Sequence, residues 1–119
     1  MIKKTSFFAL LASFLMLLPG TYATVSADEA MVAKGKQVAL DRRKGNCLAC
    51  HMMDNGPLPG NQGPPLLAMK ARFPDRAKLR EQVANPLTFN PFSIMPPFGL
   101  HNIISDDEID AIVEYLYTL

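Results

Sequence analysis

Cysteine, tryptophan and strand-like patterns are scarce or missing in this 119-residue chain. It contains two cysteines and no tryptophan, and stretches in which apolar and polar residues alternate are nearly absent. Two cysteines allow at most one disulfide within the chain, and the lack of alternation argues against a β-sheet. A formal net charge of +1 also argues against a strongly basic face of the kind that binds nucleic acid or anionic lipid.

The first 27 residues have the pattern of a secretory signal peptide. Lys3 and Lys4 precede an apolar run, residues 7–18, which is shorter than the ~20 apolar residues that span a bilayer. A small-x-small pattern ends at Ala27, so we expect cleavage there, with an uncleaved membrane anchor as the alternative. The mature chain, residues 28–119, would then be one periplasmic domain without a membrane anchor, with ten basic and eleven acidic side chains.

The C-terminal end of the chain has the stronger helical pattern. Ser105 and Glu108 can form a capping box, and Ile104 can pack against Ile109 as a hydrophobic staple. Apolar residues then recur at helical spacing as far as Leu116. We therefore expect an amphipathic helix that begins after Ser105.

A second helix is expected near the start of the mature chain. Ser26 or Asp28 can cap it, residues 42–44 place basic side chains at its negative end, and Gly45 ends it. Between the two helices the chain is rich in turns, and shorter helices are expected over two ranges, 66–72 and 75–84. The pattern predicts an all-α domain with long, proline-stiffened loops. Because so small a chain buries a modest core, something besides side chains is expected to fill its middle.

The two cysteines lie in GNCLACH, residues 45–51. A disulfide between Cys47 and Cys50 would close a tiny loop and stabilise little. A thioredoxin-like redox pair would need a preceding strand, and a zinc site would need further ligands, for which only His101 remains. CxxCH is instead typical of covalent haem attachment, in which both thiols add to the porphyrin and the next histidine binds the iron. We therefore expect one covalent haem c, held by Cys47, Cys50 and His51.

The second axial ligand has to be a methionine or His101. Met95 is the best candidate, because it lies 44 residues beyond His51 in SIMPPFG, where two prolines fix the backbone. The other mature-chain methionines fit helical core positions or lie too close to His51 in sequence: Met31, Met69, Met52 and Met53. His101 is the alternative and would give a bis-imidazole iron of lower potential. We expect it to be a partly exposed loop residue instead.

Several of these segments together resemble class I cytochromes c: CLACH, GPPL at residues 63–66, MPP at residues 95–97 and the terminal amphipathic helix. The resemblance implies a class I fold wrapped around one haem c, which such proteins acquire outside the cytoplasm. It also implies that the carbonyl of Pro64 accepts the Nδ1 proton of His51 and so orients the imidazole. Gly35 would let the first helix cross the last one closely, near Tyr115 and Leu116.

A narrower resemblance covers nearly all of the mature chain. DRRKGNCLACH, GNQGPPLLAMKARFPDRAKLREQV, FNPFSIMPPFGLH and SDDEIDAIVEYLYTL are similar to SoxX, the small monohaem family of the SoxAX cytochromes. The resemblance implies a SoxA-like partner and the L-cysteine S-thiosulfotransferase reaction, in which thiosulfate is joined to a cysteine of a SoxYZ-like carrier. The thiosulfate chemistry would then belong to the partner, while this chain passes electrons to a downstream periplasmic cytochrome.

Three functions remain open at this point. The chain could be the electron-accepting subunit of a SoxAX-like enzyme, a free-standing electron shuttle with the same ligands, or a haem enzyme or gas sensor with a displaceable sixth ligand. An iron with two protein ligands has no open position for a substrate, and no catalytic constellation is evident beside it. These two points argue against the third function, and the resemblance over nearly all of the mature chain favours the first function over the second.

Overall fold

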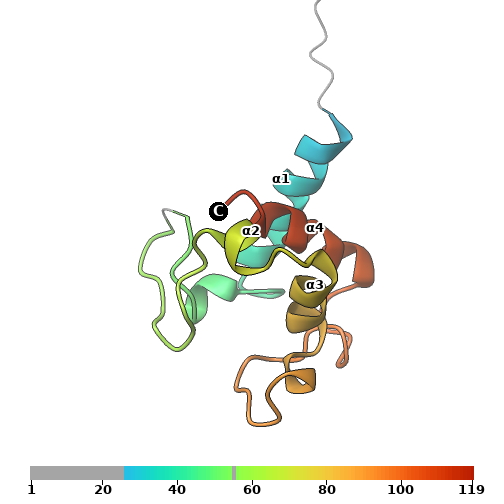
Figure 1. The fold of residues 1–119 in the computed structure, drawn as a ribbon. Coiled ribbons are helices and arrows are strands. Elements are labelled where there is room, and N and C mark those ends of the chain that lie inside the picture. Colours follow the sequence, from blue (N-terminus) through green and yellow to red (C-terminus); the bar gives the residue numbers. More distant parts are fainter. Residues whose placement is uncertain (1–25, 55) are drawn as a thin grey trace, which may run out of the picture.

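The computed structural model describes residues 26–54 and 56–119. Nearly all of the expected signal peptide lies outside these residues. In the described part the helices are α1 (Ala27–Leu40), α2 (Met69–Arg72), α3 (Arg76–Ala84) and α4 (Asp106–Leu116). Two 3₁₀ turns, η1 (Cys47–Ala49) and η2 (Pro86–Thr88), complete the order of elements (Figure 1). No strand forms within this part of the chain, where one isolated bridge joins Met53 to Leu66. The expected all-α fold is confirmed.

Helices α1 and α4 cross each other at Gly35. A Cβ at this position would overlap the backbone carbonyl of Ala111, so only glycine permits the approach. The expected crossing is therefore present, but its closest contact is Ala111 and the neighbouring Ile112, about one turn before the expected Tyr115 and Leu116. All four of these α4 residues are buried.

The start of α1 was anticipated correctly, but its end was not. Ser26 is the N-cap and forms a capping box with Glu29. The helix ends at Leu40 rather than at Gly45, because the carboxylate of Asp41 accepts a hydrogen bond from the N–H of Arg43 at 2.8 Å. Such side-chain bonds compete with the helical pattern. The basic residues 42–44 consequently lie in the following turn rather than at the helix end.

Helix α4 follows its sequence pattern closely. Ser105 and Glu108 form the predicted capping box. Ile104 and Ile109 are 4% and 0% exposed, as a hydrophobic staple requires. The inward face of α4 packs on α1 and on the buried Leu79 of α3. This packing accounts for most of the core.

The two middle helices are shorter than the ranges expected for them. Ala68 has a left-handed backbone with φ of 50°, which delays α2 until Met69 instead of residue 66. Asp75 caps α3 through its side chain and so lies just outside that helix. The chain that remains forms two long loops: residues 52–68, the first loop, and residues 85–104, the second loop.

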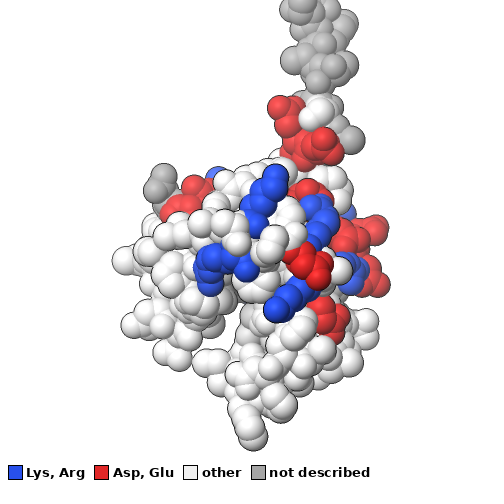
Figure 2. All heavy atoms as spheres, in the orientation of Figure 1, with Lys and Arg blue, Asp and Glu red and all other residues white. Residues whose placement is uncertain are grey.

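Charge separates the helices from the loops. Lys, Arg, Asp and Glu side chains gather over the helices, and much of the face below them is uncharged in Figure 2. Apart from Asp54, neither the first nor the second loop contains any of these four residue types. Of the described helices, none is both long and apolar enough to cross a membrane.

Candidate haem site

Residues 41–46 separate the end of α1 from the CxxCH motif, which folds as one tight turn. Cys47 opens η1, and its carbonyl accepts hydrogen bonds from the N–H groups of Cys50 at 3.2 Å and His51 at 2.9 Å. Both cysteines are free thiols and are half-buried. Burial raises the pKa of the Cys47 thiol to about 11, so it is neutral near pH 7. A thiol that is neutral near pH 7 lacks the thiolate that a redox nucleophile requires.

The imidazole of His51 is oriented by a backbone carbonyl. Its Nδ1 lies 2.7 Å from the oxygen of Pro64, and because a carbonyl can only accept, Nδ1 carries the proton. The remaining nitrogen, Nε2, then has a free lone pair that can bind a metal. A Cβ on Gly63 would overlap the ring, so the preceding glycine is what lets Pro64 come this close.

Arg72 braces the segment that carries Pro64. Its guanidinium donates to the carbonyl of Pro65 at 2.6 Å and, at 3.4 Å, to that of Leu67. On the other side, the N–H of Leu66 donates to the carbonyl of Met52 at 2.8 Å. Sequence reasoning missed Arg72, because nothing in a helical pattern shows that a side chain turns back onto an earlier loop.

Met95 lies in the second loop, far along the chain from His51. Its side chain is half-buried and packs against the core. Its N–H donates to Ser93 at 3.2 Å, and the amide nitrogen of Gln82 lies 3.8 Å from its sulfur. His101, the alternative ligand, is exposed, as the sequence predicted. Of the remaining methionines, Met53 and Met69 are almost fully buried, so the core role expected for Met69 is confirmed. Met31, for which the same role was expected, is only half-buried and lies outside the core.

The two loops supply the surface that a large apolar group requires. Eight large apolar side chains stand out as exposed in the described chain, and all eight belong to the two loops: Met52, Leu58, Leu67, Phe89, Phe92, Ile94, Leu100 and Ile103. Leu58 and Phe92 are 97% and 90% exposed. Such exposure indicates a binding surface. Together with two thiols, an oriented imidazole and a thioether, these residues fit a haem.

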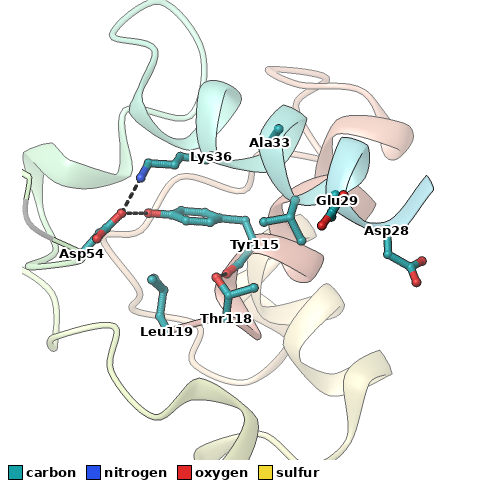
Figure 3. A pocket seen from close by; sticks show the side chains of 9 residues that line it. Asp28, Glu29, Ala33, Lys36, Asp54, Tyr115, Thr118 and Leu119 are labelled. Carbon is teal, nitrogen blue, oxygen red and sulfur yellow. Dashed lines mark hydrogen bonds and ion pairs between the residues drawn. The ribbon is translucent and has the colours of Figure 1, made fainter. Parts of the chain in front are cut away.

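A groove beside α1 offers no comparable chemistry. It measures about 510 Å³ and is bounded by α1, Asp54 and the chain end at Leu119 (Figure 3). Lys36 donates to Asp54 at 2.6 Å, and the hydroxyl of Tyr115 donates to the same carboxylate at 3.3 Å. Burial, helped by Asp54, raises the pKa of Tyr115 to about 12. The polar groups that line the groove are thus largely bonded to each other.

Comparison with known families now decides the class of protein. The family model described as "Cytochrome C oxidase, cbb3-type, subunit III" matches residues 30–116. The chain belongs to this cytochrome c family. It is therefore an electron-transfer domain of the cytochrome c type, with the small all-α fold of class I, and membership of the family implies haem c.

A curated relative extends the comparison to another organism. An uncharacterized lipoprotein of Aquifex aeolicus (strain VF5) is 38% identical to this cytochrome over 76 residues. The match covers 63% of this chain and 37% of the relative, so the chain spans little more than a third of that protein's length.

Proposed function

We propose that this cytochrome binds one haem c covalently and relays single electrons. Cys47 and Cys50 would form the thioether bonds by addition of their thiols to the porphyrin, while His51 Nε2 and Met95 Sδ would bind the iron. The observation that carries the proposal is the concentration of every exposed large apolar side chain of the described chain in the two loops that follow His51 and contain Met95. Bound haem would supply the one-electron chemistry, and the side chains that surround it would tune its reduction potential.

The chain's own side chains tune the site. The carbonyl of Pro64 fixes the tautomer of His51 and makes the imidazole more basic, so that Nε2 becomes a stronger ligand for a metal. Met95 contributes a thioether, which stabilises ferrous iron and raises the reduction potential relative to a second histidine. With both His51 and Met95 as ligands, the protein would leave the iron no open position for water or substrates. Electron transfer then needs no proton or bond rearrangement.

We further propose that the chain is exported to the periplasm and works there as the small subunit of a SoxAX-type complex. Support comes from the signal-like residues 1–27 and from the four long segments that resemble SoxX. The Aquifex aeolicus relative is named a lipoprotein, and this name agrees with export. The SoxA-like partner would carry the thiosulfate chemistry with a SoxYZ-like carrier, and this chain would pass the electrons to a downstream cytochrome.

A free-standing electron shuttle is the second candidate. It is compatible with the site, because this chain alone supplies all the proposed attachment and iron-binding residues: Cys47, Cys50, His51 and Met95. A shuttle would need only brief contacts with its donor and acceptor. Both candidates share the same haem chemistry, so only the permanence of the partner separates them.

The test is expression in a host competent for cytochrome c maturation, with a pyridine haemochrome spectrum of the purified protein. We expect a haem c spectrum with one haem per chain, and a b-type or haem-free spectrum would overturn the proposal. Co-expression with a SoxA-like subunit and a pull-down on this chain then separates the candidates. A stoichiometric complex supports the SoxAX-type subunit, whereas purification as a monomer supports the shuttle.

A further inference from the structure

The side chain of Gln82, on α3, contacts Met95 in the second loop. It lies on α3, between the buried Leu79 and Val83, which anchor that helix in the core. Its side-chain nitrogen lies 3.8 Å from the sulfur of Met95, and both side chains are half-buried.

The backbone of the second loop is attached at the end of the same helix. The N–H groups of Gly99 and Leu100 donate to the carbonyl of Ala84 at 2.9 and 3.2 Å. The chain around Met95 is thus fixed to α3 at two points, once through backbone and once through the Gln82 side chain. Ser93 adds a local bond to the N–H of Met95 at 3.2 Å.

The chemistry of the contact fixes its direction. A side-chain amide can present either its oxygen or its nitrogen, but an oxygen facing sulfur would bring two lone pairs together. The nitrogen therefore faces Met95 and donates. A thioether sulfur has two lone pairs, so it can accept this bond with one and bind iron with the other.

We propose that Gln82 is a positioning residue for the axial ligand. Its amide holds the thioether of Met95 in one orientation, which lowers the entropy cost of binding the iron. The inference rests on the proposed role of Met95 as a ligand and adds to it a residue that sequence patterns do not single out. Gln82 itself does not touch the iron in this scheme.

The experiment measures how tightly Met95 is held in the oxidised holoprotein. Imidazole is titrated at neutral pH, and replacement of methionine is followed by loss of the absorption band that thioether sulfur gives with ferric iron. Gln82→Leu keeps the approximate size and removes the donor. We expect half-replacement at a roughly three- to tenfold lower imidazole concentration, the equilibrium effect of one lost hydrogen bond.

Glu81→Gln is the matched control on the same helix. The Glu81 carboxylate accepts from the hydroxyl of Thr88 at 2.7 Å, a bond that does not involve Met95. This variant should titrate as the unmodified protein does. If Gln82→Leu does not mature, Gln82→Glu offers the same shape with a carboxylate that cannot donate, and it should shift the titration in the same direction.

Met95→Ala, alone and combined with Gln82→Leu, separates the possible failures. If Met95→Ala keeps the thioether band, both the ligand assignment and the role of Gln82 are wrong. If it loses the band while Gln82→Leu titrates like the unmodified protein, only the role of Gln82 is overturned. In the Met95→Ala background Gln82→Leu should leave imidazole binding unchanged, and an equal shift there would contradict action through Met95.

Discussion

The helices and the two loops of this cytochrome are held together by different means. The helices carry capping boxes, a glycine-mediated crossing and ion pairs between side chains, such as those of Arg80 with Asp106 and Asp110. The two loops hold one charged residue, Asp54, and expose large apolar side chains. The helical part is thus stabilised by contacts within the protein, whereas the loops leave apolar side chains exposed that a bound group could cover.

The largest expected effect comes from removing both thiols. Cys47→Ala combined with Cys50→Ala should abolish covalent haem, lose cooperative unfolding and leave the amides of both loops unprotected, because the core alone is small. Calorimetry and hydrogen exchange would measure this. A double variant that remains fully helical and unfolds cooperatively without haem would show that the loops need no such group.

Within the helical part, the largest loss of stability is expected at the crossing of α1 and α4. Gly35→Ala should destabilise the holoprotein by about 3 kcal/mol, because the added methyl overlaps the Ala111 carbonyl and pushes α4 away. Denaturant unfolding measures the change. Elsewhere in a helix the same substitution stabilises by up to about 1 kcal/mol. A stabilising result would therefore mean that the two helices do not meet at Gly35.

A medium effect is expected where the first loop meets α2. Arg72→Leu removes the donor to the carbonyls of Pro65 and Leu67 and should cost about 1–2 kcal/mol. It should also speed exchange of the His51 Nδ1 proton, measured by NMR of the reduced holoprotein. The exposed Lys70, also on α2, gives the control Lys70→Leu. Equal exchange rates in the two variants would refute the bracing role of Arg72.

The smallest effect is expected at the pair formed by Lys44 and Glu108. Lys44 lowers the pKa of the Glu108 carboxyl, helped by the N–H of Ser105. A lowered pKa means that the contribution to stability is present above the unfolded-state pKa and is lost as the pH falls through the folded-state value. Lys44→Met should cost less than about 1 kcal/mol at pH 7. At a pH below both pKa values it should cost nothing, and an equal cost there would contradict the ion pair.

Local patterns predicted the helical part better than the loops. The capping box at Ser105 acts over three residues, so it can be seen in the sequence before any fold is known. The end of α1 was missed because the Asp41 side chain forms a competing turn. The late start of α2 was missed because the left-handed backbone at Ala68, which is not a glycine, has no signature in the sequence.

In the candidate site, too, some features could be predicted from the sequence and others could not. CxxCH is contiguous, so its chemistry could be inferred directly. The contact of His51 with Pro64 came from family resemblance, and the structure contains it at 2.7 Å. Arg72 and Gln82 act on segments distant from their own helical turns, and their contacts depend on how those segments fold back. No pattern within a helix could have indicated them.

The proposed function depends on covalent bonds between haem and the two cysteines, Cys47 in η1 and Cys50 directly after it. Peptide mass spectrometry of the protein purified from a host that matures cytochromes c tests it most directly. We expect the peptide containing residues 45–51 to carry the added mass of one haem, bound at both Cys47 and Cys50. The same peptide found with two unmodified thiols, or with a Cys47–Cys50 disulfide, would contradict it.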